Sequence, residues 1–211
     1  MTDKSNPTGV FDAIPPYLVR EGFLGSELVN KLIEFAVENE ARFQESTTGM
    51  TGNEQVRPEW RISRLLRDFG PLKQEIKSRF KAVLPEALEF LGMPNFDLYH
   101  VELEIVAHGN GAFYNTHIDT AIDKDDESVR VLTAVYYFHT QPKVFSGGNI
   151  RLLPLRQTAG DSVYCDISPE NDRLLLFPSW VPHRVMPVVS ESVQFSDSRF
   201  AINCWYRKSR I

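Results

Sequence analysis

A two-residue alternation of apolar and polar side chains over residues 98–105 constrains the fold of this chain most strongly. The apolar positions are Tyr99, Val101, Leu103 and Ile105, and the polar positions between them are His100, Glu102 and Glu104. Successive side chains of a β-strand point to opposite faces of its sheet. The alternation therefore predicts a strand with one face buried in a core.

Seven more short runs with strand character follow this strand, and Gly, Pro, Asn and Asp residues separate them. We place them at residues 112–117, 130–139, 149–153, 162–167, 173–177, 183–189 and 199–206. Many short strands without intervening helices favour a sandwich or jelly roll over a parallel α/β sheet. Gly147 and Gly148 indicate a bend where the backbone passes close to another segment.

The first part of the chain has helical periodicity instead. A helix is expected to begin near Ser26 as its N-cap, since its apolar residues then follow two i, i+4 rows. These rows are Leu28, Leu32 and Ala36, and Val29, Ile33 and Val37. A second helix is expected over about residues 71–91, kinked or divided at Pro85. We therefore divide the chain into an N-terminal helical and lid region (1–96) packed on a β core (97–211).

Two segments of the N-terminal region have loop composition. Residues 1–15 are polar and contain proline, which predicts a loose lead-in. Residues 44–58 are rich in Gly, Thr and Ser and predict a long mobile loop. Long loops in compact domains often act as lids, so we expect this one to cover a site.

Composition narrows the class of partner. A net charge of −5 provides no basic field for nucleic acid. The polar N-terminus does not resemble a signal peptide, and no apolar run has the length of a membrane span. Cys165 and Cys204 are too few for a disulfide framework and are expected to be small buried hydrophobes. These features favour the reducing cytoplasm and leave the oligomeric state open.

Candidate metal ligands lie in the predicted strand that ends at His117. His117 and Asp119 are two residues apart, so on a strand they point to the same face. With His183 they would complete a 2-His-1-carboxylate triad, which leaves three positions open on Fe(II) for an oxoacid and O₂. The His-x-Asp pair alone is a weak signal, and His183 alone is equally compatible with a structural histidine at a strand start.

The segments around this triad make it specific. They are FSGGNIRLLPL (145–155), ISPENDRLLLFPSWVPHRVMPV (167–188) and SRFAINCWYRK (198–208). In this order they resemble the prolyl 4-hydroxylase-like branch of the 2-oxoglutarate/Fe(II) oxygenases, which includes the hypoxia-sensing prolyl hydroxylases. The resemblance covers about residues 97–207. It implies a double-stranded β-helix core (a cupin-like jelly roll) and a catalytic iron held by His117, Asp119 and His183.

The resemblance also implies a binding site for 2-oxoglutarate. Arg199 matches the family's basic residue that pairs with the distal carboxylate, and Tyr137 matches a phenol offered to the same group. Thr133 shares the face of Tyr137 and is expected to line the same pocket, whereas Tyr136 faces the opposite way. Arginine suits this task because its planar fork holds a carboxylate with two charge-assisted bonds. An inward arginine in the apolar run RFAINCWY also needs an anion.

Residues on the substrate side are less strongly implied. We assign Trp60, Arg61, His108, Tyr114 and Trp205 to this group, with plain core packing as the alternative for Trp205. The family often has Tyr-x-Pro-Gly before the His-x-Asp pair. Residues 106–111 of this chain lack that tyrosine, so His108 or Tyr114 would have to take over any polar role that it has. The connection from His183 to Arg199 is longer than in the hypoxia-type enzymes that the chain resembles. We therefore expect residues 188–198 to form an extended hairpin loop that could reshape the substrate entrance. Both departures weaken any assignment of protein-bound proline as the substrate.

The resulting hypothesis is a dioxygenase that decarboxylates 2-oxoglutarate to succinate and CO₂ and oxidises an unactivated C–H bond. Its cofactors would be Fe(II), 2-oxoglutarate and O₂, with any role for ascorbate left open. Asp119 favours hydroxylation or another oxidation over halogenation, because related halogenases replace this carboxylate with a small residue. Two substrate classes stay open: a prolyl or other residue of a peptide, and a small molecule such as an amino acid or natural-product intermediate. The alternative is a non-catalytic, cupin-like metal-binding protein, which would have no need of Arg199.

Overall fold

The computed structural model describes residues 10–49, 54–120, 127–156 and 163–210. The fold is mainly β, and its strands form two large sheets and a small one. The seven-stranded sheet has the order β1-β11-β7-β14-β5-β4-β2, and the five-stranded sheet has the order β10-β9-β12-β6-β3. Strands β13 and β8 form a separate pair.

The strands are β1 (Leu18–Glu21), β2 (Gln44–Glu45), β3 (Arg61–Ile62), β4 (Arg64–Leu66), β5 (Leu98–His108), β6 (Phe113–His117), β7 (Ser128–Phe138), β8 (Phe145–Gly147), β9 (Ile150–Leu152), β10 (Cys165–Ile167), β11 (Arg173–Pro178), β12 (His183–Val185), β13 (Val188–Ser190) and β14 (Arg199–Ser209). The α-helices are α1 (Ser26–Glu38) and α2 (Lys73–Phe90). Short 3-10 helices span Val10–Asp12, Glu40–Arg42, Gly70–Leu72 and Phe195–Asp197.

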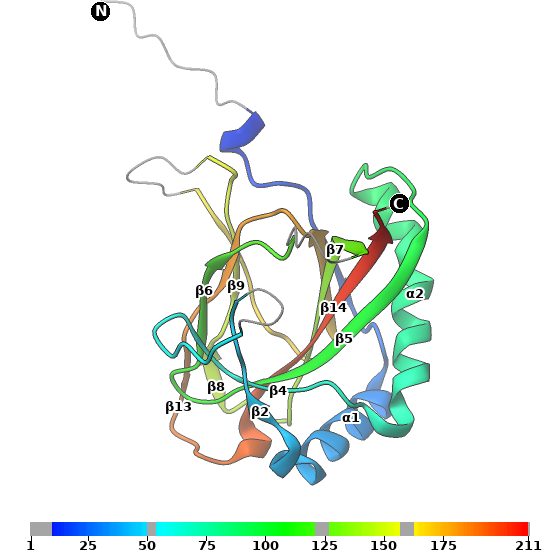
Figure 1. The fold of residues 1–211 in the computed structure, drawn as a ribbon. Coiled ribbons are helices and arrows are strands. Elements are labelled where there is room, and N and C mark those ends of the chain that lie inside the picture. Colours follow the sequence, from blue (N-terminus) through cyan, green and yellow to red (C-terminus); the bar gives the residue numbers. More distant parts are fainter. Residues whose placement is uncertain (1–9, 50–53, 121–126, 157–162, 211) are drawn as a thin grey trace, which may run out of the picture.

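The long strands β5, β7 and β14 present two different faces. One face packs against α1 and α2 and forms the main apolar core, as Figure 1 shows for the helices beside β5 and β14. Its residues from these strands alternate in sequence: Val101, Leu103, Ile105, Ala107, Leu132, Ala134, Tyr136, Phe138, Phe200, Ile202, Cys204 and Tyr206. The residues between them point toward the five-stranded sheet. A smaller apolar cluster, which includes Val135, Tyr137 and Ile150, fills part of the space between the two sheets.

All eight predicted strand regions contain strands, with some changes in their limits. The region 183–189 is divided into β12 and β13, because Pro187 lacks the N–H that a continuous ladder would need. Ser162 of the predicted region 162–167 lies outside the described residues. Strands β1 to β4 and β8 were not predicted, since each is only two to four residues long.

Both predicted helices are present, and α1 differs from expectation in how its first turn is capped. α1 begins at Ser26 as predicted, but the cap position is Gly25, and no side chain caps the helix. The amides of Leu24 and Gly25 instead donate to the carboxylate of Asp172. α2 continues through Pro85 and is not divided there.

The N-terminal region contributes strands as well as helices. β1 pairs with β11, β4 with β5, and β3 with β6, so segments before residue 97 extend both large sheets. The expected loop 44–58 contains β2, which pairs with β4, and a bridge between Thr48 and Gln55. Residues 50–53 of that loop and 1–9 of the expected lead-in lie outside the described residues. The domain boundary after residue 96 stays a prediction.

Three further expectations concern the cysteines, the loop 188–198 and membrane spans. Both cysteines are free; Cys204 is buried, but Cys165 is only partly buried and donates to the Tyr17 hydroxyl. Residues 188–198 are not simply a loop, because they contain β13 and a 3-10 helix. None of them lines the pocket described below. No helix among the described residues is long and apolar enough to cross a membrane.

Candidate functional site

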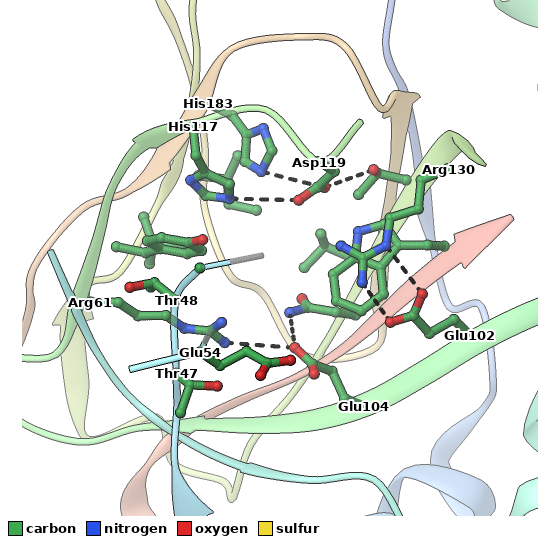
Figure 2. A pocket seen from close by; sticks show the side chains of 18 of the residues that line it. Thr47, Thr48, Glu54, Arg61, Glu102, Glu104, His117, Asp119, Arg130 and His183 are labelled. Carbon is green, nitrogen blue, oxygen red and sulfur yellow. Dashed lines mark hydrogen bonds and ion pairs between the residues drawn. The ribbon is translucent and has the colours of Figure 1, made fainter. Parts of the chain in front are cut away.

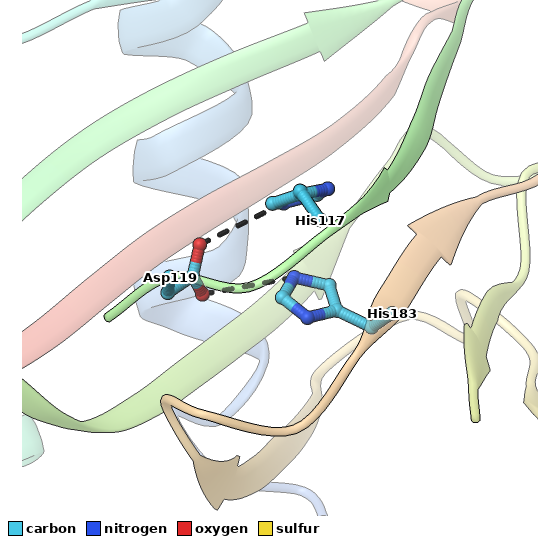
Figure 3. Close-up of side chains that lie close together, drawn as sticks. All are labelled: His117, Asp119 and His183. Carbon is cyan, nitrogen blue, oxygen red and sulfur yellow. Dashed lines mark ion pairs between the residues drawn. The ribbon is translucent and has the colours of Figure 1, made fainter. Parts of the chain in front are cut away.

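His117, Asp119 and His183 meet between the two large sheets (Figure 3). His117 ends β6 and lies opposite His183, which begins β12. The two histidine Nε2 atoms lie 3.6 Å from Oδ1 and Oδ2 of Asp119, respectively. One potential ligand atom from each residue lies within 4.8 Å of the others. The structure thus places two imidazoles and one carboxylate where they can share a single metal ion.

Hydrogen bonds fix the direction of each of these side chains. Nδ1 of His117 lies 2.8 Å from the carbonyl oxygen of Asn115, and Nδ1 of His183 lies 2.9 Å from that of Val181. A carbonyl can only accept, so each Nδ1 carries the proton and each Nε2 keeps its lone pair for a metal. The hydroxyl of Thr133 donates to Oδ2 of Asp119 at 2.8 Å.

The protonation states of His117 and Asp119 also favour metal binding. Burial, together with the nearby charge of His183, lowers the pKa of His117 to about 3. Burial raises the pKa of Asp119, but the two histidines and Arg130 outweigh it and leave that pKa below its ordinary value. At neutral pH the site therefore offers a neutral imidazole at His117 and an ionised carboxylate at Asp119.

A β-bulge brings Tyr114 against His117. In the pairing of β12 with β6, His183 lies opposite His117 and Val185 lies opposite Tyr114, so two steps on β12 match three on β6. On a regular strand, residues three apart point to opposite faces. Here the rings of Tyr114 and His117 are stacked, with centroids 3.6 Å apart and planes inclined by 20°.

Arg199 lies at the start of β14, and its side chain is 1% exposed. Its Nε donates to the carbonyl of Gly148 at 2.7 Å, and Nη1 lies 3.2 Å from Nδ1 of His108. Its guanidinium carbon lies 4.9 Å from the centroid of the Tyr137 ring. Nη2 of Arg199 and the hydroxyl of Tyr137 are buried without a hydrogen-bond partner among the described residues.

A pocket of about 350 Å³ opens beside the triad (Figure 2). The lining includes the apolar side chains of Val135, Ile150 and Val185, together with Thr133 and Trp205. It also includes charged residues: Glu54, Arg61, Arg67, Glu102, Glu104, Arg130 and Arg207. The described part of the expected lid contributes Thr47, Thr48, Gly49 and Glu54 to the lining.

The charged residues form two networks. Glu102 accepts bonds from Arg130 and Arg207, and Arg130 lies over the ring of Trp205 at 3.7 Å. Oε1 of Glu104 lies 3.6 Å from Nη2 of Arg61 and accepts a bond from Asn203. Most of the charge on this wall is therefore paired within the protein.

The sequence-predicted residues fall into three groups. His117, Asp119, His183 and Thr133 lie together with Arg61, Tyr114 and Trp205 around the pocket. Arg199, Tyr137 and His108 form a second, deeper group that does not line the pocket. Trp60 is 42% exposed and does not line it either.

Sequence reasoning missed several pocket residues. Glu102 and Glu104 occupied the polar positions of the first predicted strand, and Asn203 and Arg207 continue the alternation of Arg199 and Trp205. This alternation signalled which face they share. It did not indicate that the face lines a pocket, because a polar face more often meets solvent.

Comparison with known proteins supports the same family. Residues 103–207 match the model of the 2OG-Fe(II) oxygenase superfamily. An uncharacterized PKHD-type hydroxylase of Synechocystis sp. is 34% identical over 194 residues, which cover 89% of this chain and 62% of that protein. Human Egl nine homolog 1 is 35% identical over 104 residues, covering 46% of this chain and 20% of that protein. The chain thus spans less than two thirds of either relative.

Solved structures share the fold at lower identity. A prolyl-4-hydroxylase from Pseudomonas putida has a TM-score of 0.66 and 23% identity, covering 91% of this chain and 92% of that one. A prolyl hydroxylase from Trichoplax adhaerens, in complex with a hypoxia inducible factor peptide fragment, has a TM-score of 0.66 and 22% identity. It covers 90% of this chain and 82% of that one.

Proposed function

Because the chain is a prolyl 4-hydroxylase-like member of the 2OG-Fe(II) oxygenase superfamily, we propose that it is a dioxygenase that binds Fe(II) and 2-oxoglutarate and oxidises a C–H bond of its substrate. The proposal includes a cupin-like double-stranded β-helix core over residues 97–211. It also includes an N-terminal region, residues 1–96, that closes part of the pocket.

One observation carries the cosubstrate assignment. Arg199 is fully enclosed, yet no carboxylate among the described residues pairs with it, and its Nη2 and the Tyr137 hydroxyl both lack partners. A buried guanidinium without an anion is costly, so a ligand that supplies a carboxylate would satisfy both donors. A passive metal-binding protein would have no reason to keep this arrangement.

The donor set fits Fe(II). Two imidazole nitrogens and one carboxylate oxygen form the 2-His-1-carboxylate group that leaves coordination positions open. His117, Asp119 and His183 would hold the metal, and Thr133 would orient the carboxylate through its hydrogen bond.

Bound Fe(II), O₂ and 2-oxoglutarate would supply the oxidation, with succinate and CO₂ as co-products. The chain's own contribution is binding, orientation and exclusion of water. Arg199 and Tyr137 would hold the far carboxylate of 2-oxoglutarate, while Val135, Ile150 and Val185 keep the adjoining wall apolar. The pocket beyond the triad would receive the substrate.

Both substrate classes stay within the proposal. The Trichoplax neighbour, which has the same fold, was solved with a peptide, and this supports a peptidyl substrate. The paired charges of Arg61, Glu104, Glu102 and Arg130 support a polar substrate, whether a peptide or a small molecule.

The test is an anaerobic titration of Fe(II) protein with 2-oxoglutarate, followed by an aerobic screen for succinate release with peptides and metabolites, with and without ascorbate. Wild-type protein should develop a weak visible charge-transfer band, and His117→Ala and His183→Ala should not. His100→Ala removes a histidine outside the pocket lining and is the matched control. Metal binding without this band and without succinate would favour the passive metal-binding alternative.

A further inference from the structure

The ring of Tyr114, which stacks on His117, also contacts the guanidinium group of Arg61. The guanidinium carbon of Arg61 lies 4.7 Å from the centroid of the Tyr114 ring, and Arg61 and Tyr114 are paired across β3 and β6. Arg61 and His117 lie along the same side of the pocket in Figure 2. The tyrosine ring therefore contacts a candidate metal ligand and a buried cation at once.

Arg61 is itself held in place by several contacts. Its Nε donates to the hydroxyl of Ser63 at 2.9 Å, and that hydroxyl donates to Ser46 at 2.8 Å. Its Nη2 lies 3.6 Å from Glu104, a carboxylate that is 4% exposed. A buried arginine with this many fixed contacts provides a rigid support for the ring that it touches.

The two histidines are constrained in different ways. His183 meets Phe177 edge to face, with centroids 4.8 Å apart. His117 instead presents the face of its ring to Tyr114. The hydrogen bond from Nδ1 of His117 to Asn115 sets the direction of one ring nitrogen, whereas a stacked neighbour restrains rotation of the whole ring plane.

From these contacts we infer that Tyr114, supported by Arg61, is a positioning residue for His117. It holds the imidazole plane in the orientation that directs Nε2 toward the metal position. The bulge in β6 serves this purpose, because without it Tyr114 would point to the other face of the strand. This inference rests on the proposed function only in that His117 binds the metal.

The phenol hydroxyl plays no part in this role. The contact with His117 is made by the face of the Tyr114 ring, which a phenylalanine shares. A phenylalanine at this position should therefore position His117 equally well, while an aliphatic side chain of similar size should not. This difference separates positioning by the ring face from a polar contact to substrate.

The experiment is a titration of the metal-free protein with Co(II), which replaces Fe(II) and reports its ligand geometry through visible bands. Tyr114→Leu should weaken Co(II) binding by about 2- to 12-fold, the range that a favourable aromatic pair supports. Its bands should also shift in position or intensity. Tyr114→Phe should restore both the affinity and the spectrum of the wild type.

Arg61→Met tests the support for the ring, and a smaller loss of about 2-fold is expected. Its matched control is Arg64→Met, which removes a guanidinium that lies 5.0 Å from the Phe195 ring and outside the pocket lining. The control should bind Co(II) as the wild type does. Thermal unfolding of each metal-free variant shows whether the chain is folded.

The outcomes separate this inference from the proposed function. If a folded Tyr114→Leu protein keeps the wild-type affinity and spectrum while His117→Ala loses binding, the positioning role is wrong and the metal site stands. If Tyr114→Phe fails as Tyr114→Leu does, the hydroxyl matters and the role assigned to the ring face is wrong. If His117→Ala binds Co(II) as the wild type does, both the triad and the positioning role are wrong.

Discussion

Arg199 of β14 lies directly opposite His108 of β5, and its Nη1 is 3.2 Å from Nδ1 of the imidazole. Both side chains are buried. Burial, with the positive charges of Arg199 and Arg61, lowers the pKa of His108 well below its ordinary value. The histidine is therefore neutral and accepts a hydrogen bond from the arginine. It therefore supports the candidate cosubstrate anchor through this contact.

This neutral histidine predicts a pH dependence of stability. The pKa of His108 is lower in the folded than in the unfolded protein, so as the pH falls below about 6.5 the unfolded state takes up a proton that the folded state does not. Stability should therefore fall with the pH in this window. At one unit below the unfolded pKa, one such histidine contributes a loss of about 1.4 kcal/mol.

Urea unfolding of the metal-free protein at pH 7.5 and pH 5.5 measures this effect. His108→Asn keeps an acceptor for Arg199 but has no titrating group, so its loss of stability between the two pH values should be about 1 kcal/mol smaller than that of the wild type. An equal loss in both proteins would mean that His108 does not stay neutral in the fold.

Arg199→Ala should weaken the binding of 2-oxoglutarate by about 30- to 3,000-fold. Removing one partner of a buried charge pair typically costs about 2–5 kcal/mol, because the other charge is left unpaired. Arg199→Lys should retain part of the affinity, since it keeps the charge but loses the fork. The measurement is an anaerobic titration of each Fe(II) protein.

Arg151→Ala is the matched control for that titration. Arg151 lies on β9 and makes two hydrogen bonds to Asp166, outside the pocket lining. Its loss should leave the affinity for 2-oxoglutarate unchanged. Wild-type affinity in Arg199→Ala would place the anchor elsewhere.

Gly148→Ala should disturb the same anchor without removing it. A Cβ at Gly148 would lie 2.7 Å from Cδ of Arg199, and the residue has a φ of +66°. We expect a loss of affinity for 2-oxoglutarate on the order of 10-fold or more, because the guanidinium must move from its place. Gly22→Ala has a similar φ of +63° but meets nothing within 4 Å, so it controls for backbone strain alone. Equal affinities in the two variants would contradict the prediction.

Thr133→Val should weaken metal binding by removing the donor to Oδ2 of Asp119. Loss of a residue that orients a metal ligand typically costs about 10- to 100-fold in affinity. Thr133→Ser keeps the hydroxyl and should bind nearly as the wild type does. Co(II) affinity measured by calorimetry distinguishes the two, and similar values for Val and Ser would show that this hydrogen bond does not support the site.

The sequence by itself determined those features that depend on spacing along one strand. Asp119 follows His117, the last residue of β6, by two positions, and Arg199 and Trp205 share a face of β14 because they are six apart. The alternation in β5, β7 and β14 also determined which face packs on the helices. These relationships are local, because each follows from the geometry of an extended backbone.

Only the tertiary structure decided the contacts between strands. Tyr114 and His117 are an odd number of residues apart, and they stack only because the pairing of β12 with β6 contains a bulge. Similarly, the short strands β1 to β4 lack a readable period, and they form where a neighbouring strand offers free backbone groups. Glu104 is contacted by Arg61 of β3, by Arg67 just after β4 and by Asn203 of β14. Such contacts depend on the register between strands, which no single stretch of sequence records.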